Sequence, residues 1–250
     1  EKCILTVMAS DTGRQKKKED YFVSMERLMY WARKDVSLLN PLMDSIRELN
    51  FETMEEDDLY AYTRLLLTGA GGETKSFVFG ELNQMIRHYY KNDKEMFWNL
   101  LNFIRENHGS VYEELVIANA SNSEFIKTVL FRPVVDLTEL EYAVKYHTSF
   151  FHKKEYAAYL TECGYALYRH TSNKAKQEKI DQLGKKIDED LFVEYKKKDV
   201  EQVINQAESL NTYLHIVDRM NTQAMEKPIQ DFLYQRAIDF LKEEKVIEIK

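Results

Sequence analysis

Apolar residues recur at intervals of three and four positions along most of the chain, which is the period of an amphipathic helix. The apolar residues of 77–89 and of 96–104 follow this period, and each run continues for two or more helical turns. The first series of this kind predicts a helix that ends near Arg33: Phe22, Met25, Leu28, Met29, Trp31 and Ala32.

Residues that cap helices recur between these apolar runs. Asn40-Pro41 predicts one helix start, because asparagine caps helices and proline fits the first helical position. Gly69 follows a run that includes Leu66 and predicts a C-terminal cap. Caps this close together indicate several helices joined by short links, as in antiparallel helical hairpins. Four further starts have Ser, Thr or Asn three residues before Glu, the spacing of a capping box: 53–56, 92–95, 110–113 and 121–124.

Only two segments have a strand-like composition. Residues 2–9 predict a short strand or an arm. Residues 128–136 are rich in β-branched side chains, but Pro133 argues against a central strand. We interpret 131–136 as an extended crossover between two helical halves. Helical periodicity then predicts five more helices: near 137–151, 153–170, 173–197, 200–221 and 228–245.

The chain uses few residues that form turns. It has 3 prolines and 8 glycines in 250 residues, below the usual fractions of about 5% and 7%. We therefore predict an all-α protein of about ten helices in consecutive antiparallel hairpins, as an irregular α-solenoid or a helical bundle. The expected parts are a flexible arm over 1–18 and helical halves over 19–131 and 137–250, which could also form one continuous domain.

Charge and hydropathy narrow the classes of partner. The 42 acidic and 35 basic residues give a net charge of −7, which argues against an extended phosphate-binding surface. No apolar run reaches the roughly 18 to 20 residues needed to cross a bilayer, so we expect a cytoplasmic protein without a membrane segment. Cys3 and Cys163 lie far apart and predict two unpaired thiols.

The glycine cluster at 69–76 has two interpretations. As a phosphate-binding loop, it would use Gly69, Lys75 and Ser76, because glycine amides wrap a phosphate, lysine reaches its outer oxygens and a hydroxyl binds magnesium. However, Thr74 replaces the glycine that normally precedes the lysine, and the preceding run lacks the composition of a buried strand. The favoured interpretation is the tight connection of a helical hairpin.

A second candidate site lies over 152–179, where lysines and an arginine could gather near the ends of two helices with tyrosines nearby. Phosphate contacts combined with aromatic stacking would hold a single nucleic-acid strand. The favoured interpretation is that the tyrosines pack in the core and the cations are solvated. The candidate nucleic-acid contacts are Lys153, Lys154, Arg169, Lys174 and Lys176.

No residue pattern establishes a reaction. The histidines, including His147 and His152, have no metal-ligand spacing, and we predict no catalytic residues, cofactor or metal site. The first functional hypothesis is a helical-repeat-like scaffold or regulatory protein that binds a protein or peptide. The second is a nucleic-acid-binding regulator that uses 152–179. The third is a nucleotide-binding enzyme that uses 69–76. The sequence gives no oligomeric state.

Overall fold

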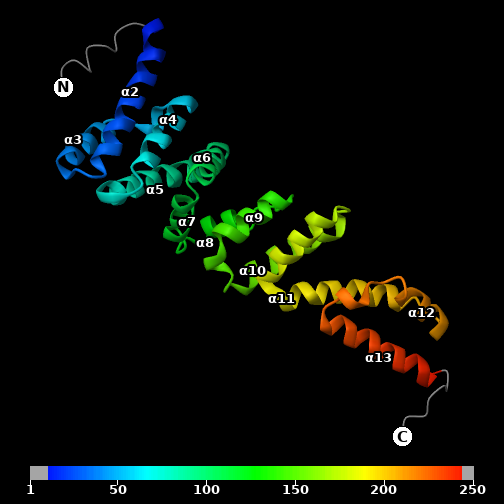
Figure 1. The fold of residues 1–250 in the computed structure, drawn as a ribbon. Coiled ribbons are helices and arrows are strands. Elements are labelled where there is room, and N and C mark those ends of the chain that lie inside the picture. The colour runs from blue at the N-terminus through cyan, green and yellow to red at the C-terminus, as the bar shows by residue number, and fades with distance from the viewer. Residues whose placement is uncertain (1–10, 244–250) are drawn as a thin grey trace. The chain divides into compact units, whose positions relative to one another are not determined.

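The computed structural model describes the backbone of residues 11–243 and the side chains of all these residues except 11–19 and 36. Over this range it contains twelve α-helices and no strand (Figure 1). The predicted all-α class is confirmed, and most contacts join helices that are neighbours in the sequence. The predicted strand or arm over 2–9 lies outside the described residues.

The described residues form two compact units, which divide between Val129 and Leu130. The helices that build the first unit are α2 (Asp11–Ala32), α3 (Val36–Arg47), α4 (Glu56–Thr68), α5 (Lys75–Asn92), α6 (Lys94–Asn107), α7 (Gly109–Ala118) and α8 (Ser123–Leu130). The helices of the second unit are α9 (Leu137–Tyr146), α10 (Lys154–His170), α11 (Lys174–Ile204), α12 (Leu210–Val217) and α13 (Lys227–Glu243).

The first unit buries the apolar face of each helix against its neighbours. In α2 the buried residues include Met29 and Ala32, both fully buried, and this helix packs on α3 and α4. A polar contact also joins α5 to α7, because buried Asn119 accepts a hydrogen bond from Arg87 Nε at 2.8 Å. The same amide donates to Asn83 Oδ1 at 2.7 Å and to Leu115 O at 2.8 Å. Asn119 thus caps α7 and fixes it to α5.

Two predicted helix starts are wrong. Helix α3 begins at Val36, five residues before Pro41, because Asp35 Oδ1 accepts hydrogen bonds from Ser37 N at 2.9 Å and Ser37 Oγ at 2.7 Å. Thr53 does not cap α4. Its hydroxyl donates to Asn50 O at 3.1 Å inside a short 3₁₀ turn, and α4 begins only at Glu56.

Other boundaries shift by smaller amounts. Asp93 rather than Asn92 caps α6, and its carboxylate accepts from Met96 N at 3.0 Å. Asn122, one residue after the predicted serine, accepts from Phe125 N at the start of α8.

The largest difference between prediction and structure lies at the start of α2. Helix α2 begins at Asp11, so residues 11–18, which we expected to belong to a flexible arm, are helical there.

The glycine cluster connects α4 to α5 through a 3₁₀ turn over Gly72–Thr74. Gly69 is the C-cap of α4, as predicted. Gly72 has a φ of +65°, and a Cβ at this position would collide with the carbonyl oxygen of Arg33, just after α2. Buried Thr74 donates to Gly69 O at 2.5 Å and lies 2.9 Å from Gly71 O. The connection is therefore a compact turn that packs against the end of α2.

We predict that Gly72→Ala lowers the free energy of unfolding by at least about 2 kcal/mol, because it adds both an unfavourable φ and a backbone collision. The matched control is Gly80→Ala. Gly80 lies exposed within α5, and a Cβ there meets no atom within 4 Å. This control should raise stability by about 0.5 to 1 kcal/mol through helix propensity. Urea denaturation followed by circular dichroism measures both, and equal effects of the two changes would contradict the close approach at Gly72.

Candidate partner-binding groove

Helix α11 is broken at Asp188, and this break shapes the second unit. Asp188 has an extended backbone (φ −156°, ψ 98°), and its carboxylate accepts a hydrogen bond from Leu191 N at 3.0 Å. It therefore caps a new helical segment. We call residues 174–187 the first arm and residues 189–204 the second arm. The ring of Phe192 occupies the space where a Cβ on Gly184 would lie, so the second arm folds back toward the first.

Helix α10 packs along the second arm through its tyrosines. The Tyr165 ring lies 5.7 Å from that of Phe192 and 5.3 Å from that of Tyr195, measured between centroids. The Tyr165 hydroxyl donates to Asp199 Oδ2 at 2.5 Å, and Arg169 Nε pairs with the same oxygen at 3.1 Å. Burial, with the hydrogen bond to Asp199, raises the pKa of Tyr165, which therefore stays a neutral donor.

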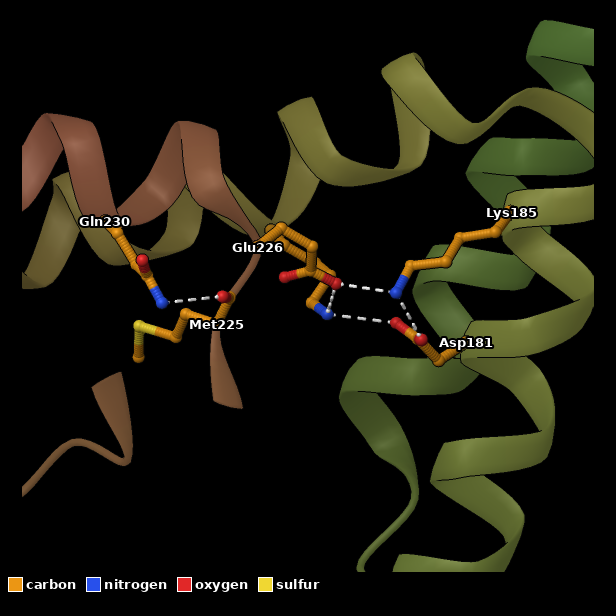
Figure 2. A network of polar contacts seen from close by, with 6 residues as sticks. Asp181, Lys185, Met225, Glu226 and Gln230 are labelled. Carbon is orange, nitrogen blue, oxygen red and sulfur yellow. Dashed lines mark hydrogen bonds and ion pairs between the residues drawn. The ribbon is translucent and has the colours of Figure 1, made fainter. Parts of the chain in front are cut away.

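Four charged side chains join the two arms to the start of α13 (Figure 2). Lys196 Nζ on the second arm lies 2.9 Å from Asp181 Oδ1 and 2.5 Å from Glu226 Oε1. Lys185 Nζ on the first arm lies 2.8 Å from Asp181 Oδ2 and 2.7 Å from Glu226 Oε1. We call Asp181, Lys185, Lys196 and Glu226 the charge network. Each ammonium group contacts both carboxylates, and the side chains are only 17–28% exposed.

The pKa shifts of Glu226 and Lys185 favour their charged forms. Burial alone would raise the pKa of Glu226, but hydrogen bonds from Lys185 and Lys196 outweigh burial and lower it to about 2. Burial would likewise lower the pKa of Lys185, whereas its bonds to Asp181 and Glu226 raise it to about 12. Glu226 and Lys185 are therefore ionised near neutral pH, and the network ties three segments together.

The segment before α13 is fixed by a second set of contacts. Gln230 Nε2, one turn into α13, lies 3.0 Å from Met225 O and 2.9 Å from Thr222 O. Figure 2 shows the first of these contacts beside Glu226. Gln230 thus holds the 3₁₀ turn Thr222–Ala224 against α13, while Glu226 holds the start of the same helix against α11.

A groove opens between α12 and α13, and the 3₁₀ turn forms part of its lining. Its volume is about 490 Å³. Leu214 and Tyr234 on its rim are 47% and 71% exposed, whereas Tyr213 and Leu233 beneath them are buried. The Tyr213 hydroxyl donates to Leu233 O at 2.6 Å and so links the two helices below the groove. None of the lining residues carries a charge: Tyr213, Leu214, Val217, Thr222, Gln223, Gln230, Leu233, Tyr234 and Ala237.

The structure places the glycine-cluster candidates at a helical connection. Gly69 ends α4, and Lys75 and Ser76 begin α5, so a helix rather than a strand leads into the cluster. Lys75 Nζ lies 3.0 Å from Glu114 Oε2 on α7 and is thus paired with a carboxylate. The cluster has the hairpin geometry that we favoured. Nucleotide binding by Gly69, Lys75 and Ser76 stays a prediction.

The five basic candidates do not gather in one place. Lys153 and Lys154 lie at the start of α10, whereas Arg169 lies near its end, about 22 Å away along the helix. Lys174 and Lys176, at the start of α11, follow Arg169 in the chain. Two of the intervening rings, Tyr156 and Tyr165, are not open for stacking because they are only 1% and 8% exposed, whereas Tyr159 and Tyr168 are half-buried. Nucleic-acid binding by these cations also stays a prediction.

The part of the chain that the structure describes contains neither a candidate membrane span nor a candidate metal site. None of its helices is both long and apolar enough to cross a membrane. Within residues 11–243, no three His, Cys, Asp or Glu side chains come together in a way that could hold a metal ion.

Comparison with protein-family models, with curated proteins and with solved structures finds no match for this chain. The described residues themselves define the class of the protein: an all-α fold with an uncharged groove between α12 and α13.

Sequence reasoning missed the groove. The apolar residues of 228–245 satisfy a helical period with a single buried face, which gives no reason to expect an open surface. One signal was present, because Tyr234 directly follows Leu233 and adjacent helical residues point in different directions. A large aromatic beside a core leucine marks a second apolar face.

We predict that Glu226→Gln lowers the free energy of unfolding by about 1 to 3 kcal/mol at pH 7, because two partly buried ammonium groups lose their shared carboxylate. Since the folded pKa of about 2 lies below the usual 4.5, this stabilisation is present above pH 4.5 and is lost as the pH falls through 2. The difference between wild type and variant should therefore shrink over that interval in urea titrations.

The matched control is Glu194→Gln. Glu194 pairs with Lys198 on the solvent side of the second arm, and both side chains are more than half exposed. Exposed pairs contribute little, so stability should be unchanged within error. If the difference between wild type and the Glu226→Gln variant stays constant down to a pH of about 2, the ionised carboxylate is not its source.

Proposed function

We propose that this chain works by binding a protein or peptide, and that the groove between α12 and α13 is its recognition site. The observation that carries the proposal is an uncharged, open groove with a largely exposed tyrosine, in a protein of which 31% of the residues are charged. Its volume of about 490 Å³ lies within the range of ligand-binding sites.

The lining defines the chemistry of the partner. Leu214, Val217 and Ala237 offer aliphatic surface, and Tyr234 adds an aromatic side chain that is largely exposed. Binding of apolar side chains here would remove this surface from water, and tyrosines often contribute a large share of binding energy at interfaces. Gln223 and Thr222 at one end can form hydrogen bonds with a peptide backbone.

A groove bounded by two helices suits an amphipathic helical segment. Such a segment presents apolar side chains at positions i, i+3 or i+4 and i+7 along one face. The absence of charged lining residues means that an acidic or basic side chain on that face would lose hydration without gaining an opposite charge. We therefore expect the contacting face of the partner to be apolar and uncharged.

The support beneath the groove suits recognition without large rearrangement. The hydrogen bond between Tyr213 and Leu233, the contacts of Gln230 and the charge network all hold α12 and α13 before a partner arrives. A preformed site loses less conformational entropy on binding than a site that must first order itself.

The test is a selection of displayed peptides against the full chain, followed by affinity measurement with synthetic copies by fluorescence anisotropy. The expected result is a set of peptides with apolar residues at helical spacing. Tyr234→Asp should weaken their binding by at least about tenfold, because it places a charge in the apolar groove and removes the exposed ring.

Val135→Asp is the matched control. Val135 is 73% exposed, like Tyr234, but lies between α8 and α9 and does not line the groove. Binding should be unaffected by this change. A selection that enriches no peptide, or peptides whose affinity is the same for both variants, would overturn the proposed site.

A further inference from the structure

The outer surface of α2 carries a row of exposed residues that the fold does not use. Phe22, Met25, Met29 and Ala32 are buried in the first unit. A different side of the helix exposes Val23 and Trp31, which are 45% and 60% accessible. We call Asp20, Val23, Arg27, Trp31 and Lys34 the α2 stripe; all five are exposed.

The stripe follows the helical repeat. Its members are separated by three, four, four and three residues, so the first four lie along one side of α2 over about 16 Å, and Lys34 follows two residues after the helix ends at Ala32. Lys34 stands in the turn that ends α2, where its backbone N–H donates to Trp31 O at 3.0 Å. Its ammonium group lies 5.4 Å from the centre of the Tyr30 ring, beside the stripe. No carboxylate within the described residues forms an ion pair with Arg27 or Lys34.

The positions of the stripe residues are symmetric about Arg27, with opposite charges at the two ends and an apolar residue on each side. Asp20 and Lys34 lie seven residues to either side of it, and Val23 and Trp31 lie four to either side. When two copies of such a helix pair antiparallel about Arg27, each aspartate faces the lysine of the other copy. Each valine then faces a tryptophan, so apolar surface meets apolar surface.

We propose that the α2 stripe is a self-association surface, on which a second copy of this chain packs through antiparallel pairing of the two α2 helices. Isologous two-fold pairing uses one patch twice and requires that patch to be complementary to itself, as this one is. A purely basic stripe would instead favour an acidic partner, but here the two ends carry opposite charges.

The two copies of Arg27 meet at the two-fold axis. Each guanidinium group can lie over Tyr30 or Trp31 of the other copy, a contact that aromatic rings favour and that keeps the two positive groups apart. Tryptophan, tyrosine and arginine are also the residues most enriched among strong interface contacts. Two helices that meet along one stripe form a small interface, and small interfaces are typical of weak, transient association, so we expect a dimer that forms only at high protein concentration.

Sedimentation velocity of the full chain at about 0.2 mM and low salt tests this proposal. The expected result is a concentration-dependent dimer. Trp31→Lys should abolish it, whereas Val135→Asp should leave it unchanged, and circular dichroism shows whether each variant keeps its helices. A wild-type chain that stays monomeric at this concentration, or a folded Trp31→Lys variant that still dimerises, overturns the proposal.

Two charge reversals test the register. Asp20→Lys and Lys34→Asp should each weaken the dimer about tenfold, because each turns two attractive pairs into repulsive ones. An equimolar mixture of the two variants should recover dimerisation, since every position 20 then faces an opposite charge at position 34 of the other chain. The double variant should recover it alone. No recovery in either sample would refute antiparallel pairing about Arg27.

Discussion

The fold of the second unit depends on the close approach of Phe192 to Gly184. Without a side chain at Gly184, the second arm of α11 can return over the first, and Asp188 supplies the cap that restarts the helix. Had α11 continued straight, Asp181 and Lys196 would lie about 22 Å apart along the axis, too far for an ion pair. The return brings them to 2.9 Å. The charge network, and through Glu226 the start of α13, therefore rests on a contact that involves no charge.

A similar dependence links the charge network to the groove. Glu226 precedes α13 and Gln230 lies in its first turn, so the network and the 3₁₀ turn are fixed by residues only four positions apart. A partly buried ion pair adds little net stability, because removing its charges from water is costly. Its main contribution here is to hold the paired segments in one arrangement. In this unit the network fixes the residue before α13 to α11, and α13 in turn forms one wall of the groove.

The all-α class could be predicted from the sequence, because the three- and four-residue spacing of apolar positions reflects the helical repeat directly. The connection at Gly69 could be predicted for the same local reason. The starts of α3 and α4 failed because Asn40-Pro41 and Thr53 have capping chemistry, but Asp35 and the 3₁₀ turn at Phe51–Thr53 compete for the same backbone. The charge network could not be predicted, since it joins Asp181 to Lys196, 15 positions away, and both lysines of the network to Glu226, 30 or more positions away. Sequence period contains no information on which distant residues meet.

The same limit explains why the predicted sites and the groove do not coincide. Glycine clusters and basic runs are visible in sequence because they are contiguous, yet in this fold Gly69–Thr74 serves a turn and the basic candidates lie at both ends of α10. The groove is assembled from two helices and the turn between them, and its defining property is the absence of charge. In a chain with 42 acidic and 35 basic residues, nine neighbouring lining residues without one charge form a local exception. Folding alone does not require apolar residues at exposed positions such as Leu214 and Tyr234, because a polar side chain there would be hydrated. A group of exposed apolar residues in one groove therefore supports the proposed recognition of an apolar partner.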